Sequence, residues 1–209
     1  MRRFLLISLS LVLALVGWSS VGAEDGFYVI PAMRGNYAPV PKTGQTNAYG
    51  RTGTDGDLKK GVAWPTPRFT DNNNGTVTDK LTGLIWMKNA QAFGAINWVA
   101  ALTAANGLAE PAKGLTDGSV AGDWRLPNVR ELQSLIDYGY SGPALPNTLG
   151  TGKWEEGSPF QGVQSGNYWS SSTTASNVSF AWSVNFLEGY VNYNGQSSNY
   201  YVWCVRGGP

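Results

Sequence analysis

Residues 122–137 read GDWRLPNVRELQSLID, and this stretch decides how we interpret the chain. It holds five charged side chains in sixteen residues, although only 14% of the chain is charged, against about 25% in an average globular protein. Asn128 is followed three residues later by Glu131, which is the spacing of a helix capping box. The apolar stripe of the expected helix consists of Leu132, Leu135 and Ile136. The stretch therefore predicts a capped helix.

Two arginines of this stretch allow a structural and a functional interpretation. Arg125 stands beside Trp124, a large apolar anchor, and such an arginine needs carboxylate or carbonyl partners. The alternative is that Arg125 or Arg130 binds an anionic ligand. We favour the structural interpretation, since charged residues at helix entries usually hold the fold. The residues that we assign to the structural signature are Trp124, Arg125, Leu126, Pro127, Asn128, Glu131, Trp169 and Cys204.

Local signals predict a hairpin and a second helix before this stretch. Asn74-Gly75 lies between β-prone segments, and both residues tolerate positive φ, which favours a tight turn. A further turn at residues 80–83 leads into an apolar strand at residues 84–86. Asn97 can cap a helix that Gly107 ends. The apolar face of that helix is Trp98, Ala101, Leu102 and Ala105.

The C-terminal third is rich in strand signals. In residues 180–186 large apolar side chains alternate with small polar ones, which predicts one buried face and one small polar face. We expect the buried face to be Phe180, Trp182, Val184 and Phe186, and the polar face to be Ala181, Ser183 and Asn185. Residues 190–194 and 200–206 predict two further strands. The expected fold class is α+β, with two helices and a mostly antiparallel sheet.

The N-terminus predicts export. Residues 1–23 combine two arginines, an apolar core and a small-residue cleavage site, the layout of a signal peptide. Residues 24–63 read as an irregular segment or linker, and residues 64–208 as the domain. Cleavage would leave 13 basic and 14 acidic residues, so a near-neutral mature chain has no bulk attraction for nucleic acid. We expect a periplasmic or secreted protein without a membrane span after cleavage.

The composition removes whole classes of catalytic chemistry. The chain has no histidine, which excludes Ser-His-Asp and Cys-His catalysis and the usual zinc sites. Cys204 is the only cysteine, so no internal disulfide forms, and its apolar surroundings favour a buried thiol. A glycosidase built from Glu155 or Glu156 with Glu188 stays an alternative that nothing singles out. We expect no enzyme and no cofactor.

A calcium loop is the one metal site that the sequence raises. Asp71, Asn73 and Asp79 carry suitable oxygen ligands. The glycine of this segment comes one position early, however, and no glutamate closes the loop. Turn chemistry explains the same residues, so we expect no metal.

Four segments in this order, GTVTDKLTGLIW, WRLPNVRELQSLID, YWSSST and YVWCVRGG, resemble the Lcl C-terminal domain family over residues 64–208. This bacterial extracytoplasmic family is named for a collagen-like adhesin. The resemblance implies a C-type-lectin-like fold, distantly similar to formylglycine-generating enzymes, and a domain that binds sulfated polysaccharides. The collagen-like repeats are absent here, and so are the cysteine pair of those enzymes and the calcium motifs of C-type lectins. The resemblance therefore favours a non-catalytic binding module for glycans or another surface partner.

Aromatic residues of the C-terminal loops and of the polar sheet face are our binding candidates. Tyrosine rings stack on the apolar faces of sugars and present a polar edge at low entropic cost. The candidate ligand-binding residues are Tyr138, Tyr140, Tyr190, Tyr193, Tyr200, Arg125 and Arg130. Alternation places Tyr190 and Tyr193 on opposite strand faces, so at most one of them can belong to the core. A structural envelope protein with a protein partner is the main alternative.

Overall fold

Two β-sheets and three α-helices make up residues 40–207, the part of the chain that our computed structural model describes. The predicted α+β class is confirmed, and strand pairing is antiparallel except between β5 and β8. The C-type-lectin-like fold remains a prediction that rests on the family resemblance. The expected signal peptide and residues 24–39 lie outside the described residues. No helix within residues 40–207 is long and apolar enough to cross a membrane.

The smaller sheet has four strands in the order β1-β2-β3-β9. Their bounds are Phe69–Asp71 for β1, Thr76–Asp79 for β2, Ile85–Met87 for β3 and Val205–Arg206 for β9. The predicted hairpin at Asn74-Gly75 is confirmed, but the residues with positive φ are Asn73 and Gly75. Asn74 instead accepts hydrogen bonds from the backbone N–H and the hydroxyl of Thr76, and so closes the turn with its side chain.

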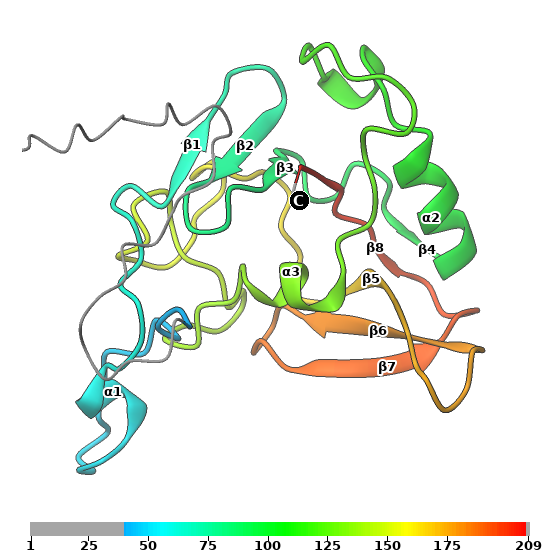
Figure 1. Cartoon of the computed structure of the whole chain (residues 1–209). Coiled ribbons are helices and arrows are strands. Elements are labelled where there is room, and N and C mark those ends of the chain that lie inside the picture. The colour runs from blue at the N-terminus through cyan, green and yellow to red at the C-terminus, as the bar shows by residue number, and fades with distance from the viewer. Residues whose placement is uncertain (1–39, 208–209) are drawn as a thin grey trace, which may run out of the picture.

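The larger sheet has five strands in the order β4-β8-β5-β6-β7 (Figure 1). The bounds are Ala95–Ile96 for β4, Asn167–Thr173 for β5, Phe180–Asn185 for β6, Val191–Gly195 for β7 and Tyr200–Tyr201 for β8. α3 packs against β5 and β6, whereas α2 packs against β5. β7 is an edge strand, so one side of its backbone faces away from the sheet.

Both predicted helices form, and each begins directly after its predicted N-cap residue. α2, Trp98–Asn106, begins after Asn97, whose side chain accepts from the N–H of Ala100, and ends at Gly107. α3, Val129–Gln133, has the complete capping box between Asn128 and Glu131. α3 is shorter than its apolar stripe predicts, because Leu135 and Ile136 follow the helix in a turn and are still buried. Two shorter pieces were not expected: α1, Asp55–Leu58, and a 3₁₀ turn, Ala112–Gly114.

The predicted polar face of β6 is wrong along the strand, because Asn185 is buried as well as Ala181 and Ser183. The predicted buried face is wrong only in its first half. Ala181 and Ser183 are fully buried, whereas Phe180 and Trp182 are only partly buried. The register pairs Ser183 with Trp169 of β5, and the ring of Tyr200 packs on Trp169 at 4.7 Å between centroids. Aromatic rings from other strands therefore cover the face that the alternation assigned to solvent.

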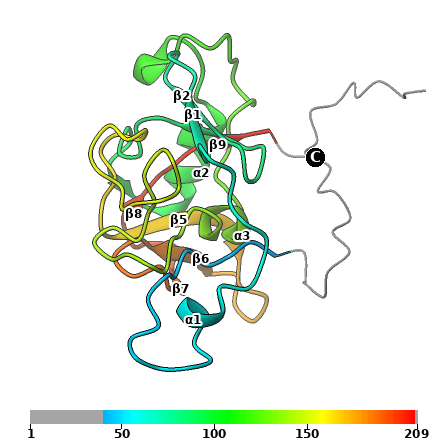
Figure 2. The ribbon, with the colours of Figure 1, turned by 90° about the vertical axis from the view of Figure 1, so that its left-hand side faces the viewer.

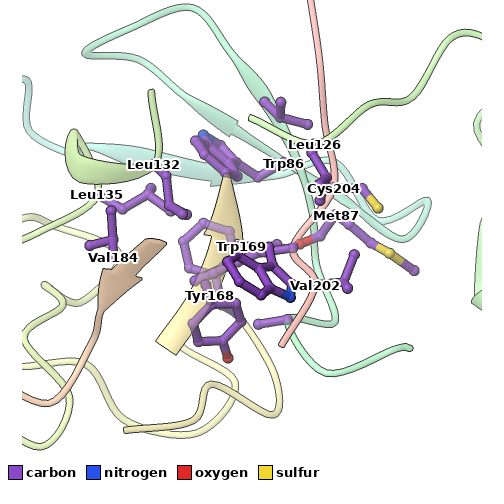
Figure 3. Packing of buried hydrophobic residues seen from close by; sticks show 14 of the residues in the cluster. Trp86, Met87, Leu126, Leu132, Leu135, Tyr168, Trp169, Val184, Val202 and Cys204 are labelled. Carbon is purple, nitrogen blue, oxygen red and sulfur yellow. The ribbon is translucent and has the colours of Figure 1, made fainter. Parts of the chain in front are cut away.

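The predicted final strand at residues 200–206 is also corrected, because it is two strands in different sheets. β8 lies in the five-stranded sheet and β9 in the four-stranded sheet, and residues 202–204 cross between them. Trp203 is fully buried in this crossing, with edge-on ring contacts to Trp86 and Phe160 at 5.8 and 4.8 Å. Cys204 is buried in the same cluster, near Met87 and Val202 (Figure 3), and burial raises the pKa of its thiol to about 12. The crossing segment occupies the centre of the core.

Residues 40–63 pack against the domain although they are mostly irregular. The N–H of Tyr138 donates to the carbonyl of Thr43, and the indole of Trp64 donates to the carbonyl of Lys42. Gly44 lies directly against the carboxylate of Asp137, where a Cβ atom would overlap it. α1 lies at the bottom of both ribbon views (Figure 2). The segment is thus held by the domain over at least residues 42–44.

Candidate functional site

Arg125 and Asn128, at the start of α3, both contact Glu131. The guanidinium of Arg125 donates two hydrogen bonds of 2.8 Å to the carboxylate of Glu131 and one to the carbonyl of Gly207. The same carboxylate accepts from the N–H of Asn128. Burial raises the pKa of Glu131, but the hydrogen bonds from Arg125 and Asn128 outweigh burial, and its net pKa is lowered. Arg125 therefore already has the carboxylate partner that the structural interpretation requires.

Arg130 and Tyr138 lie along one side of α3. Arg130 is exposed, and its guanidinium has no ion pair within residues 40–207. Gln133, one turn further on the same helix face, donates to the hydroxyl of Tyr138, which donates to the carbonyl of Gly189. This face of α3 therefore points toward the turn between β6 and β7.

Tyr140 belongs to a different environment, beside a buried carboxylate. Burial raises the pKa of Asp137, although the N–H of Gly139 and the charge of Arg68 act in the opposite direction. Burial and the Asp137 charge together raise the pKa of Tyr140. The structure therefore places Tyr140 with the contacts of residues 42–44 rather than with the other candidate tyrosines of the sheet.

The two exposed tyrosines of the β7 region lie on opposite faces of the sheet. Tyr193 is 54% exposed and makes edge-on contacts with Phe180 at 5.8 Å and Trp182 at 5.6 Å. We call Phe180, Trp182 and Tyr193 the aromatic face. Tyr190 is 48% exposed, and strand alternation assigns it to the other face, with Asn192. Neither tyrosine belongs to the core.

The second face carries a group of amide and hydroxyl side chains. Register pairs Asn167 with Asn185 across β5 and β6, and Ser183 with Asn192 across β6 and β7. Directly paired residues point to the same side of a sheet. We call this set the amide face; its members are Asn167, Ser183, Asn185, Asn192, Asn194 and Tyr200.

Hydrogen bonds join the amide-face residues in two separate sets, one over β6, β7 and β8 and the other over β5 and β6. The hydroxyl of Tyr200 donates to Asn194 at 3.0 Å, and the amide of Asn194 donates to Ser183 at 2.9 Å. The amide of Asn185 donates to Asn167 at 2.8 Å. Chains of neutral hydrogen bonds polarise one another and fix the orientation of each group. Ser183 and Asn185 are buried and orient their neighbours from below, so the accessible part of the amide face is the exposed Asn192 with the partly buried Asn167, Asn194 and Tyr200.

Sequence reasoning found only part of this surface. Tyr200 was a candidate, and Tyr190 lies at the rim, but the asparagines were not singled out. The signal was present in the alternation of Asn192 with Asn194, which places both amides on one side of a strand. Their partners Asn167 and Ser183 could not be found without the strand register.

The carboxylates that raised metal and glycosidase alternatives have partners in the structure. Asp71 accepts from the ammonium of Lys88 and from the N–H of Asn73, while Asp79 pairs with Arg68. Glu156 accepts from the N–H of Gly162. Asp71 and Asp79 therefore have the turn contacts and ion pairs that the sequence favoured over a calcium loop. Within residues 40–207, no contact joins Glu155 or Glu156 to Glu188.

One comparison with known proteins identifies the family. The model of the Lcl C-terminal domain matches residues 75–206, which include both sheets except β1. No curated protein matches the chain. The matched range contains the capped α3, the amide face and the crossing segment. The chain belongs to the Lcl C-terminal domain family.

Proposed function

We propose that this protein is an exported, non-catalytic module that binds a glycan at the cell surface or in the envelope. The observation that carries the proposal is the amide face, where the hydroxyl of the partly buried Tyr200 is oriented by Asn194 and the amide of Asn194 is oriented by Ser183. Sugars present hydroxyl groups that both donate and accept, together with apolar faces that stack on aromatic rings. The amide face offers both kinds of contact on one surface.

Two further observations support the proposal. Family membership fits an extracytoplasmic, adhesin-like domain, and the layout of residues 1–23 fits export. The composition supports a binding role over catalysis, because a chain without histidine lacks the commonest general base. The one thiol, Cys204, is buried with a raised pKa, which disfavours a nucleophilic role for it.

The test is a glycan array probed with residues 24–209. The array should include neutral and sulfated polysaccharides and be read at low and at physiological salt. Selective retention of any glycan class supports the proposal. Silence of the whole array at both salts contradicts glycan binding.

A protein partner is the second candidate, and the aromatic face favours it. Tyr193 exposes more than half of its surface on the edge strand β7, next to Trp182. Exposed aromatic side chains of this kind are typical of protein interfaces. A photoreactive amino acid at position 193 tests this candidate in cells, because only a partner seated on the aromatic face would be crosslinked with high yield.

A further inference from the structure

Charged side chains are unevenly distributed over the molecule. Residues 89–109 contain none, and residues 157–205 contain only Glu188. These two segments supply α2 and every strand of the five-stranded sheet. The surroundings of the amide face are therefore almost free of charge, whichever groups a ligand meets there.

Lys113 and Arg130 lie on segments between β4 and β5 in sequence and do not belong to the strands of the five-stranded sheet. Lys113 lies over the ring of Phe93, with its ammonium 5.0 Å from the ring centroid. Arg130 stands on α3, which covers the opposite face of the sheet beside Val184 (Figure 3). No lysine or arginine belongs to the strands that carry the amide face, so a polyanion would find no counter-charge on these strands.

The amide face keeps unused hydrogen-bonding capacity. An asparagine amide can donate two hydrogen bonds and accept two. Within residues 40–207, the NH₂ groups of Asn167 and Asn192 make no hydrogen bond, and Asn192 is exposed. The Tyr200 hydroxyl donates to Asn194 and keeps its acceptor sites. Free donors and a free acceptor are therefore both present among the amide-face residues that reach solvent.

This pattern discriminates between two kinds of glycan. The hydroxyl groups of a neutral sugar donate and accept, and so match a surface that offers both. A sulfate or carboxylate only accepts, and losing its hydration without a cation in reach is unfavourable. We infer that the ligand of the amide face is an uncharged saccharide, bound with Tyr190 at the rim; this inference rests on the proposed glycan-binding function.

The experiment compares neutral and sulfated ligands on matched variants. The probes are cellohexaose, mannohexaose and laminarihexaose, each with its sulfated derivative, in titrations at low and at physiological salt. Asn192→Ala alters the amide face and Tyr190→Ala its rim, and Tyr193→Ala and Arg130→Ala are controls on the other face. All four residues are exposed, so thermal unfolding should confirm that each variant folds like the parent protein.

The expected result is binding of at least one neutral oligosaccharide with the same affinity at both salts. Tyr190→Ala and Asn192→Ala should each weaken it about tenfold, which corresponds to roughly 1.4 kcal/mol, whereas the two controls leave it unchanged. Binding of sulfated probes alone, weakened by salt and lost in Arg130→Ala, would overturn the inference but keep the proposed function. If Tyr190→Ala and Asn192→Ala both left the affinity for the neutral oligosaccharide unchanged, the assigned site would be wrong. Silence toward every probe would contradict the proposed function itself.

Discussion

The two sheets of this protein use polar side chains in opposite ways. The four-stranded sheet and its surroundings hold charges in pairs, whose members are Arg68 with Asp79, Lys88 with Asp71, Arg206 with Asp117, and Arg125 with Glu131. The five-stranded sheet holds neutral amides and hydroxyls that hydrogen-bond to one another. These groups keep donors and acceptors that no protein group uses within the described residues. Charge therefore completes contacts in one half, while neutral polarity leaves them available in the other.

The difference shows why a concentration of charge is a poor guide to a binding site here. A buried charge without its partner is costly, so charges in a folded core are selected together with their counter-charges. A neutral amide can satisfy part of its capacity inside the protein and offer the remainder to a ligand. Four substitutions, two of which affect the strongest ion pairs, test this contrast.

Arg68→Met should have the largest effect, because it leaves the fully buried Asp79 without its cation. The guanidinium of Arg68 also lies over the rings of Trp64 and Phe69, at 4.3 and 4.7 Å from their centroids. We expect a loss of about 3–5 kcal/mol in the free energy of unfolding, measured by urea denaturation. The double variant with Asp79→Asn keeps the acceptor for the turn and removes the charge, so it should be more stable than Arg68→Met alone. A loss below about 1 kcal/mol in the single variant would mean that this pair does not hold the frame.

Glu131→Gln should cost about 1–2 kcal/mol at neutral pH, since glutamine keeps the capping acceptor but loses the charge paired with Arg125. The folded pKa of Glu131 lies below its ordinary value of 4.5, so its contribution is present above that pH. It is lost as the pH falls through the lowered folded pKa. The measurement is urea denaturation of both proteins across this range, and the difference should shrink toward the acid end. A difference that stays constant with pH would contradict a charge-based role.

Tyr200→Phe probes the neutral half. It removes the hydroxyl that donates to Asn194, and we expect a loss of about 0.5–1.5 kcal/mol in the free energy of unfolding. Because both groups are neutral, the loss should be equal at low and high salt. Tyr201→Phe is the matched control, since the hydroxyl of Tyr201 has no hydrogen bond within the described chain. A loss of unfolding free energy that changes with salt, or equal losses in Tyr200→Phe and Tyr201→Phe, would contradict the stabilising role of this neutral hydrogen bond.

Lys88→Met should have the smallest effect. Its ammonium lies 2.6 Å from Asp71, but both side chains are a quarter to a third exposed, and such pairs contribute about 0–1 kcal/mol. High salt should abolish the difference from the parent protein in thermal unfolding, because solvent ions screen exposed pairs. If Lys88→Met lowered the stability by more than this, and high salt did not remove the difference, the pair would behave like the buried pair of Arg68 and Asp79.

The features that could be predicted from the sequence depend on local contacts. Asn97 and Asn128 cap helices by bonding to backbone groups two or three residues away, and both caps form. Asn74-Gly75 closes a hairpin for the same reason. Such signals need only a short stretch of chain, so a single sequence is enough to find them.

The features that were missed depend on residues far apart in the chain. The buried face of β6 is decided by Trp169 and Tyr200, which lie on other strands. The amide face likewise needs the register of β5, β6 and β7 before Asn167 and Asn192 are seen as neighbours of one surface. Alternation within one strand cannot supply that information.

The crossing of residues 202–204 has a consequence for how the protein loses its structure. The same seven residues, 200–206, end the five-stranded sheet and close the four-stranded one. Neither sheet can detach without pulling Trp203 out of the aromatic cluster that both share. The two halves should therefore melt in one calorimetric transition. A carboxypeptidase that trimmed the chain past Arg206 would remove β9 and destabilise both sheets together.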